Sequence, residues 1–570
     1  MFPKNKLAQL VISAIHQFNI DTVVISPGSR NAPLIIGFSN HPKIKTLSVV
    51  DERCAAFFAL GIAQQIQKPV AIVCTSGSAL LNYYPAIAEA FYSKIPLIVI
   101  SADRPKHLID IGDGQTIRQE NVFENHILFS ANLKEGSTLK NQKAINKALN
   151  IAITQKSSVH INVPFDEPLY ETVDEIQDVI ANEVTQSFKK EFTSLQVPRN
   201  DNKLDAIASE TKQSVNFEQF SNIWNTSTKK LILVGSHFPD DELQTILKHF
   251  SDDNSVLIMT ETTSNLHHAR FINSIDQLIF SLDKKQLEEL QPEILITIGG
   301  LVVSKKIKQF LRKYQPKHHW HINEYTKLNT YYCLTEFVQE NAIFFLKHLS
   351  EKSVKKESAY QQEWLLEKKD RIKNHQEILI KSSYSDLKVF EQVLSSIPNN
   401  SNLQLSNSST IRYTQLFDVN KTLHVFCNRG TSGIDGSTST AIGAAFAKKN
   451  QTVFITGDLS FFYDSNGLWN NYIPNNFRII IINNNGGGIF RFIPGPQKTN
   501  ATHYFETPHQ LTAKHLAKMY NFAYKSVLDL ESLKIALESF YIASHQPKIL
   551  EIFTPKEVND VVLKNYFKNV

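Results

Sequence analysis

The sequence predicts an α/β protein with three doubly wound domains, each built on a parallel sheet. Two observations predict this class. Short β-branched runs alternate with longer segments of helical periodicity, which is typical of parallel α/β units. These units form three series, separated by polar stretches near residues 185 and 355. The length of 570 residues agrees with this division, because a single core stops growing at about 250–300 residues.

The predicted elements follow a regular order along the chain. Residues 1–20 carry apolar side chains at helical spacing and predict an amphipathic helix rather than a secretory leader. The expected strands are 22–26, 70–76, 95–101 and 159–164, then 229–236, 255–261, 293–300 and 318–323, then 423–430, 451–458, 478–485 and 548–555. We place the domains at 1–184, 185–355 and 356–570.

Charge and cysteine content argue against several classes of protein. The chain has 60 basic and 55 acidic residues, and no basic block indicates nucleic-acid binding. Its 4 cysteines are far apart and form no CxxC pair, which argues against a zinc site or a disulfide framework and favours a reducing cytoplasm. No apolar run approaches the roughly 20 residues that a membrane span needs.

Polar residues follow two neighbouring strands of the third series. Gly457 and Asp458 end one apolar run, and Asn484 and Asn485 end the next. In a parallel sheet these ends meet at the edge where ligands bind. A carboxylate, an amide oxygen and a carbonyl from the glycine run 486–488 would suit Mg²⁺ that keeps positions for diphosphate oxygens. The alternative is a helix cap at Asp458 and an asparagine turn.

This segment resembles the motif of thiamine-diphosphate enzymes, Gly-Asp-Gly followed further along by Asn-Asn. Leu459 stands where most of that superfamily has glycine, which indicates a subgroup. The resemblance implies a thiamine-diphosphate-binding fold in which Mg²⁺ or Mn²⁺ is held by Asp458, Asn485 and Gly487. Ile489 and Phe490 would then pack near the cofactor, although they fit equally well as plain core residues.

The same superfamily implies a glutamate that contacts the aminopyrimidine ring from another domain. Glu52 lies in VVDERCAAFFALGIA, where a strand gives way to a helix. A carboxyl group buried against the pyrimidine N1′ can share a proton with it and so assist loss of the thiazolium C2 proton. Asp51 is the alternative candidate, and both residues also fit as favourable charges at a helix N-terminus.

Eight short motifs at the two ends of the chain carry a more specific resemblance. They are ISPGSRNAPL, TSGSALLNYYPAIAEA, SADRP, DGQTIRQ, NSSTIR, CNRGTSGIDGSTSTAIGAA, DLSFFYDSNG and INNNGGGIF. Together they resemble the 2-succinyl-5-enolpyruvyl-6-hydroxy-3-cyclohexene-1-carboxylate synthase family of menaquinone biosynthesis. The Leu459 variant agrees with that family. The middle domain resembles that of the family mainly in being the same type of α/β domain.

The resemblance implies that 2-oxoglutarate is decarboxylated on thiamine diphosphate and that the succinyl unit adds to isochorismate. Both substrates are dicarboxylates, and arginine suits them through its bidentate fork. The positions implied for the substrates are Ser29, Arg30, Arg104, Gln115, Ser408, Arg412 and Arg429, with Lys305 or its neighbour Lys306 added from the middle domain. Gln115 is also the family position for a polar group beside the reacting atoms. Each arginine alone fits a structural salt bridge as well.

Two helix starts in the third domain are further candidates. Ser408 and Arg412 are four residues apart, so we expect them on one side of a helix capped by Asn407. Residues 437–440 are expected to open a helix whose first amides face the diphosphate. Capping alone explains that second pattern equally well.

The superfamily places its cofactor between the first domain of one subunit and the third domain of another, so we expect a homodimer, extended to a dimer of dimers. Rival interpretations are an acetohydroxyacid synthase or related decarboxylase, and a non-catalytic regulatory or scaffolding relative. The Leu459 variant and the arginines argue against the first, and intact Glu52, Asp458 and Asn485 against the second. A nicotinamide enzyme lacks support because no GxGxxG follows a predicted first strand.

Overall fold

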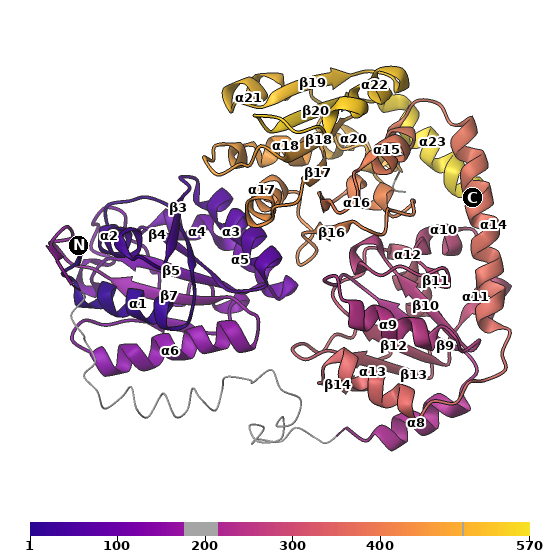
Figure 1. Cartoon of the computed structure of the whole chain (residues 1–570), viewed down its shortest axis with the longest axis horizontal. Helices are drawn as coiled ribbons and strands as arrows, with labels where there is room; N and C mark the ends of the chain where they lie inside the picture. The colour runs from indigo at the N-terminus through magenta and orange to yellow at the C-terminus, as the bar shows by residue number, and fades with distance from the viewer. Residues whose placement is uncertain (176–214, 493–494) are drawn as a thin grey trace.

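The computed structural model describes residues 1–175, 215–492 and 495–570 (Figure 1). They form three 6-stranded sheets in which all neighbouring strands are parallel. The predicted fold class is therefore confirmed. The polar stretch expected near residue 185 lies outside the described residues. Within the described part, no helix combines the length and the apolar character that a bilayer crossing requires.

The first domain has its sheet in the order β3-β2-β4-β5-β7-β6. Its strands are β2 (Thr22–Ile25), β3 (Lys45–Ser48), β4 (Val70–Cys74), β5 (Leu97–Asp103), β6 (Ser130–Asn132) and β7 (Val159–Pro164), and its helices are α1 (Lys6–Gln17), α2 (Ala32–Asn40), α3 (Glu52–Ile66), α4 (Ser78–Asn82), α5 (Tyr84–Ser93) and α6 (Thr138–Thr154). A short antiparallel pair joins β1 (Phe2–Pro3) to β8 (Thr172–Val173). Helices α1, α2 and α6 cover one face of the sheet, and α3, α4 and α5 cover the other.

The middle domain has a different strand order, β11-β10-β9-β12-β13-β14. Its strands are β9 (Lys230–Val234), β10 (Val256–Thr260), β11 (Phe271–Ile272), β12 (Ile294–Ile298), β13 (His318–Ile322) and β14 (Glu336–Val338), and its helices are α8 (Phe217–Thr226), α9 (Asp241–Phe250), α10 (Ile275–Phe280), α11 (Lys284–Leu290), α12 (Lys305–Lys313) and α13 (Ala342–Glu351). Counted along the chain this is 3-2-1-4-5-6, the order of dinucleotide-binding folds.

The third domain repeats the topology of the first. Its strands are β15 (Asn402–Leu405), β16 (His424–Cys427), β17 (Thr452–Gly457), β18 (Phe477–Asn483), β19 (Ala523–Val527) and β20 (Lys548–Phe553), and its helices are α14 (Tyr360–Lys381), α15 (Asp386–Ser396), α16 (Ser409–Thr414), α17 (Ser437–Ala447), α18 (Asp458–Tyr463), α19 (Ile489–Phe492), α20 (Thr502–Glu506), α21 (Lys514–Met519), α22 (Leu530–Phe540) and α23 (Lys556–Asn569). Short 3₁₀ turns are η1 (Lys106–Leu108), η2 (Glu124–His126), η3 (Thr262–Ser264), η4 (Ser465–Leu468) and η5 (Pro496–Lys498). In chain order both sheets run 2-1-3-4-6-5.

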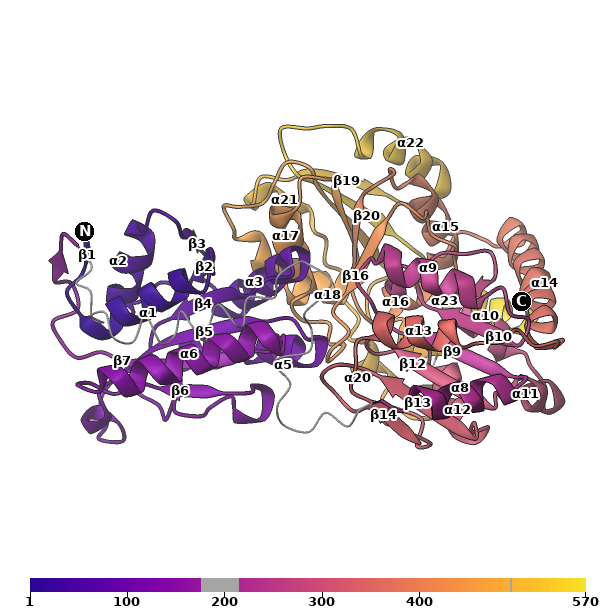
Figure 2. The same ribbon diagram turned by 60° about the horizontal axis from the view of Figure 1, so that its bottom comes forward.

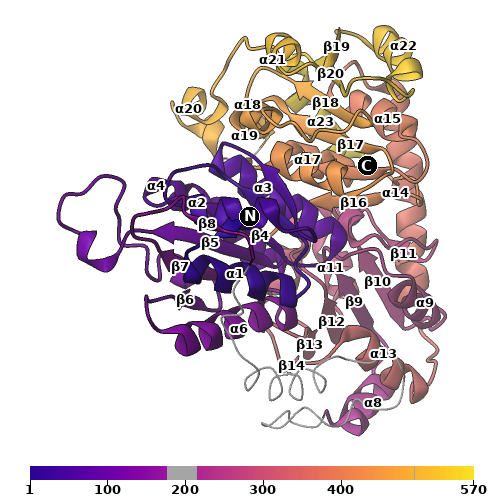
Figure 3. The same ribbon diagram turned by 60° about the vertical axis from the view of Figure 1, so that its left-hand side comes forward.

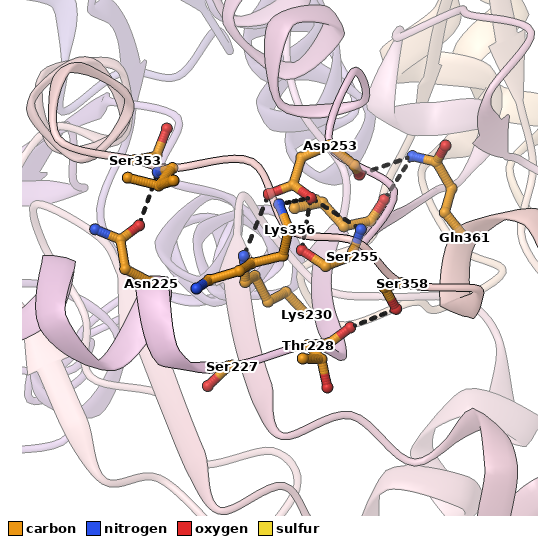
Figure 4. A network of polar contacts seen from close by, with 12 residues as sticks. Asn225, Ser227, Thr228, Lys230, Asp253, Ser255, Ser353, Lys356, Ser358 and Gln361 are labelled. Atoms are coloured by element: carbon orange, nitrogen blue, oxygen red, sulfur yellow. Dashed lines mark hydrogen bonds and ion pairs between the residues drawn. The ribbon is translucent and has the colours of Figure 1, made fainter.

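The charged connection near residue 355 is anchored on the middle domain rather than loose. Figure 4 shows the network: the backbone amide of Lys356 donates to Asp253 Oδ1 at 3.2 Å, and Ser358 Oγ donates to Thr228 O at 2.9 Å. Asp253 also pairs at 3.3 Å with Lys230, whose side chain is fully buried. The long helix α14 then packs against β10 and against α23 of the third domain.

The first and third domains share one hydrophobic core. Helices α3 and α17 lie side by side (Figures 1 and 3), and a single apolar cluster contains buried residues of both domains, among them Phe58, Ile442 and Phe461. A Cβ on Gly61 would lie 2.0 Å from Thr440 O, and a Cβ on Gly443 would lie 2.0 Å from Phe58 O. Only glycine permits this approach. Figure 2 shows the third domain between the other two.

Replacing Gly61 with alanine tests this contact. The added Cβ has to push the two helices apart, so we expect the free energy of unfolding to fall by about 1–3 kcal/mol. Gly114→Ala is the control, because its Cβ meets no atom within 4 Å and should change stability by less than about 0.5 kcal/mol. Thermal unfolding measures both variants, and an unchanged Tm for Gly61→Ala would contradict the close packing.

Candidate active site

The predicted site residues lie beyond the carboxyl ends of strands, apart from Lys305 and Lys306, which open α12. In the first domain Arg30 follows β2, Glu52 follows β3 and Arg104 follows β5. In the third domain Ser408, Arg429, Asp458 and Asn485 follow β15, β16, β17 and β18 respectively. Because each sheet is parallel, its carboxyl ends share one edge, where doubly wound folds bind ligands.

Asp458 links the loops that follow β17 and β18. The residue is 3% exposed and is the first of α18. Its Oδ1 accepts the Leu459 amide at 2.7 Å, and its Oδ2 accepts the Gly486 amide at 2.9 Å. His509 Nε2 lies 3.2 Å from the same Oδ2. Sequence reasoning missed His509, because no motif marks it and it comes from the loop after α20.

The two adjacent asparagines differ in their surroundings. The side-chain amide of Asn484 donates to Asp386 Oδ2 at 3.0 Å. Burial raises the pKa of Asp386 to about 6, against the opposing effect of hydrogen bonds from Thr554 and Asn484. Asn485 has a left-handed backbone, with φ 63°, and its side chain makes no hydrogen bond within the described residues. Asn485 is therefore the asparagine whose amide is available to a ligand.

The glycine run is fixed against the segment before α21. The Gly487 amide donates to Glu506 O at 2.7 Å, and a Cβ on Gly486 would lie 2.6 Å from that same oxygen. Glu506 is itself held by Arg491 and by Lys556, the latter at 2.9 Å. Ile489 and Phe490 open α19 directly after the run and are partly exposed.

This edge fits a hard divalent cation that arrives with a diphosphate. Asp458, the Asn485 amide and a glycine carbonyl could supply oxygen ligands, and a Cβ on Gly457 would meet no atom within 4 Å. Among the described residues no group of three or more His, Cys, Asp or Glu side chains could hold a metal. The protein alone thus supplies few charges, and phosphate oxygens would complete the coordination.

Glu52 and Asp51 differ in a way that favours Glu52 as the proton-sharing group. Burial raises the pKa of Glu52, and the charge of Asp51 raises it further. Burial also acts to raise the pKa of Asp51, but hydrogen bonds from Cys54 and Asn466 outweigh it and leave the pKa below its ordinary value. Asp51 Oδ1 caps α3 by accepting the Cys54 amide at 3.0 Å. Asp51 is therefore occupied as a charged cap.

The third-domain cations meet at the ends of β15 and β16. Arg429 is 9% exposed, and its Nη1 donates to Asn407 Oδ1 at 2.7 Å. Arg412 Nη1 donates to Ser408 O at 2.6 Å, and Ser408 has a left-handed φ of 68°. Arg429 also lines a cleft of about 530 Å³ where the three domains meet.

The expectation that Asn407 caps the helix of Ser408 and Arg412 is wrong. The cap position of α16 is Ser408, and it has no side-chain cap hydrogen bond. The Asn407 amide instead donates to Asn428 O and Gly433 O, each at 2.7 Å. Asn407 is buried, as are Asn428 and Arg429, which it contacts. Buried carbonyls and a buried guanidinium require hydrogen-bond partners from the protein, whereas the half-exposed start of α16 can bond to water.

The middle domain adds charged groups that sequence reasoning missed. Glu261, 1% exposed, accepts the amides of Val303 and Ser304 at 2.7 and 2.8 Å. The charge of Arg429 acts to lower the pKa of Glu261 and that of Lys308. The charge of Arg412 acts in the same direction on the pKa of Asp276. Of the two predicted lysines, Lys305 is exposed and Lys306 lies over the Phe280 ring at 4.3 Å.

The first-domain candidates form a separate group. Arg30 is buried, with Nη1 donating to Phe165 O at 2.9 Å and Nη2 3.4 Å from Glu167. Arg104 donates to Gly114 O at 3.2 Å, while Ser29 and Gln115 are exposed. The buried Nε atoms of Arg30, Arg104 and Arg429 have no hydrogen-bond partner among the described residues. In that part of the chain no hydrogen bond or ion pair joins this group to the third-domain group.

Comparison with known proteins identifies the family. The model for the N-terminal TPP binding domain of thiamine pyrophosphate enzymes matches residues 5–128, the middle domain model matches 168–405, and the C-terminal TPP binding domain model matches 408–552. The chain is 54% identical to the 2-succinyl-5-enolpyruvyl-6-hydroxy-3-cyclohexene-1-carboxylate synthase of Flavobacterium johnsoniae over 578 residues, with 100% of both chains covered. The chain belongs to this synthase family.

Further comparisons agree with the synthase family. The enzyme of the same name from Flavobacterium psychrophilum is 53% identical, again with 100% of both chains covered. The crystal structure of benzoylformate decarboxylase from Polynucleobacter necessarius superposes with a TM-score of 0.71 at 15% identity, covering 97% of this chain and 99% of that one. That likeness shows the shared fold. The family and the thiamine-diphosphate dependence that the motifs predict are thus confirmed.

The buried carboxyl group of Glu261 should make the stability of the fold depend on pH. Burial raises its pKa to about 7 from an ordinary value of 4.5, against the hydrogen bonds from Ser304 and Val303. The folded chain therefore binds the proton more tightly than the unfolded chain, so the stability that Glu261 contributes is full below pH 4.5 and is lost as pH rises toward 7. Glu261→Gln cannot ionise and should lose less stability over this range.

Urea unfolding at a series of pH values measures this difference. The control is Glu351→Gln, which replaces an exposed glutamate of α13 and should follow the unmodified chain. Parallel stability curves for Glu261→Gln and the unmodified chain would contradict the assignment.

Proposed function

We propose that the chain decarboxylates 2-oxoglutarate and adds the succinyl unit to isochorismate, using thiamine diphosphate with Mg²⁺ or Mn²⁺, in menaquinone biosynthesis. The observation that carries the proposal is the full-length match to the synthase family, at 54% identity. The buried carboxylate of Asp458, which accepts the backbone amide of Gly486 next to Asn485, supports it. So do the arginines whose buried Nε atoms lack partners among the described residues.

The residues of the third domain would hold the metal and shape the reaction space. We assign Asp458, Asn485 and the Gly487 carbonyl as metal ligands. Ile489 and Phe490 provide an apolar wall, which favours CO2 loss because the carboxylate charge disperses as the bond breaks. When bound, thiamine diphosphate supplies the acidic carbon that adds to the oxo group and accepts the electron pair released with CO2.

Glu52 and the cations have distinct tasks in this proposal. Glu52, with its raised pKa, holds a proton at the pyrimidine N1′ atom. Gln115 lies beside the reacting atoms, and the substrate carboxylates and hydroxyls are bound by a polar set: Ser29, Arg30, Arg104, Ser408, Arg412, Arg429 and Lys305. Fixed guanidinium groups suit this task because they bind carboxylates through two parallel hydrogen bonds.

We propose a homodimer on the expectation from the family that the cofactor lies between the first domain of one subunit and the third domain of another. Within the described part of one chain, no hydrogen bond or ion pair joins Arg30 or Arg104 of the first domain to Arg412 or Arg429 of the third. A dimer of dimers follows from the same family expectation. We also propose the domain limits 1–184, 185–355 and 356–570, and a cytoplasmic location that suits four unpaired cysteines.

The direct test is CO2 release from 2-oxoglutarate by the purified chain, with thiamine diphosphate and Mg²⁺. We expect cofactor-dependent release that isochorismate accelerates, with a product of the adduct mass in mass spectrometry. Release from pyruvate but not from 2-oxoglutarate would replace this substrate assignment with that of an acetohydroxyacid-type enzyme. Failure to bind the cofactor would revive a non-catalytic role.

Two substitutions separate proton sharing from metal binding. Glu52→Gln should abolish turnover while thiamine diphosphate still binds, because only the proton shared with N1′ is lost. Asp458→Ala should remove the Mg²⁺ dependence of cofactor binding itself. Isothermal titration of each variant, with and without Mg²⁺, measures the difference. Normal turnover of Glu52→Gln, or unchanged cofactor affinity of Asp458→Ala, would refute the corresponding role.

A further inference from the structure

The residues on both sides of Glu52 are bound by a short segment of the third domain, residues 463–466. Asn466 Nδ2 donates to Asp51 Oδ2 at 3.0 Å, and Arg53 Nη2 donates to Tyr463 O at 3.0 Å. The Arg53 guanidinium also lies over the Tyr463 ring, 5.0 Å from its centroid. The start of α3 is therefore held from outside its own domain, immediately before and immediately after the candidate glutamate.

Asp464 is the buried centre of this 463–466 segment. Its side chain is fully buried, and its carboxylate accepts the Ser439 amide at 2.7 Å and Ser439 Oγ at 3.0 Å. Cys54 Sγ lies 3.7 Å from Asp464 Oδ1, and Arg53 lies 3.9 Å from it. One carboxylate thus joins the first turn of α17 to the first turn of α3.

The same contacts occupy one of the backbone amides at the N-terminus of α17. Residues 437–440 were expected to present their amides to a diphosphate, and they do open α17. The Ser439 amide is already bound by Asp464, however, so an internal carboxylate occupies one of the positions that an external anion would take. This segment of α17 serves at least in part to fix Asp464.

A compact stretch of chain connects the 463–466 segment to Asp458. Helix α18 begins at Asp458 and ends at Tyr463. The Asp464 amide then donates to Ser460 O at 3.3 Å, and the Gly467 amide donates to Asp464 O at 3.1 Å. The candidate metal ligand and the residues that hold the start of α3 therefore belong to one hydrogen-bonded unit.

From these contacts we propose that Asp464 and Asn466 are positioning residues for Glu52: they fix the first turn of α3 against residues 463–466 of its own chain. The inference rests on the proposed function, in which Glu52 contacts the cofactor. Glu52 is half-exposed and is the first residue of its helix, where a helix end frays unless it is held. After the Cys54 amide, the hydrogen bond from Asn466 is the next contact that opposes burial and keeps the pKa of Asp51 low.

Asn466→Ala tests the inference, with Asn476→Ala as the matched control. Asn476 also makes two hydrogen bonds, to Lys449 O and Asn450 O, but both stay within the third domain. We expect Asn466→Ala to slow hydrogen–deuterium exchange at C2 of bound thiamine diphosphate, and kcat with it, by roughly 10- to 100-fold, with cofactor Kd unchanged. Asn476→Ala should change stability alone.

A readout without cofactor separates positioning from general damage. Amide exchange of the cofactor-free protein, followed by mass spectrometry, should show lost protection at the start of α3 in Asn466→Ala and not in Asn476→Ala. Asp464→Asn, which keeps the side-chain shape and removes the charge, should give the same pattern. If both Asn466→Ala and Asp464→Asn exchange C2 at the unmodified rate, the positioning role is overturned.

The outcome for Glu52→Gln distinguishes the two levels of the proposal. Slow C2 exchange in Glu52→Gln together with normal exchange in Asn466→Ala and Asp464→Asn would remove the positioning role alone. Normal exchange in Glu52→Gln would remove the proposed function of Glu52 itself, and the inference with it.

Discussion

The separation of α3 and α17 is set by contact between backbones rather than between side chains. Gly61 and Gly443 each face a carbonyl of the opposite helix, at a distance that leaves no room for a Cβ. Both helices begin at the carboxyl edge of their own sheet. Because the helices are packed tightly together, the carboxyl edges of the first and third sheets are held in a fixed relation. The loops with Glu52 and Asp458 lie at these edges, so their positions within one chain depend on this contact. The shared apolar cluster of the two domains depends on the same contact.

Much of the fold could be predicted from the sequence. Most of the strands that were not predicted share one property. The expected strands all exist, and all except the edge strand β16 are central strands of their sheets, which in parallel sheets are continuous apolar runs. The missed strands are mostly short or polar edge strands: β3, β6, β11, β14 and β19. Strand β15 was missed although it is second in its sheet, since NLQL alternates polar and apolar residues and resembles a surface segment.

The candidate site shows a different limit. Motifs indicated which residues follow which strands, and this placed Asp458 and Asn485 at one edge. Motifs gave no information about neighbours that are distant in sequence. Glu261 at the amides of Val303 and Ser304, Asp464 near Arg53 and His509 near Asp458 are contacts of this kind. The Asn407 prediction was wrong for the same reason, because a local capping rule competed with buried carbonyls from another loop.

The common strand order of the first and third domains implies a symmetry inside the chain. Helices α3 and α17 each follow the second strand of their sheet in chain order, so the interface joins equivalent elements, as in an isologous dimer contact. The close contacts follow the same equivalence, since Gly61 of α3 faces the Thr440 carbonyl of α17 and Gly443 of α17 faces the Phe58 carbonyl of α3. The chain therefore contains, between two of its own domains, the kind of reciprocal contact that two copies of one domain make in a twofold dimer.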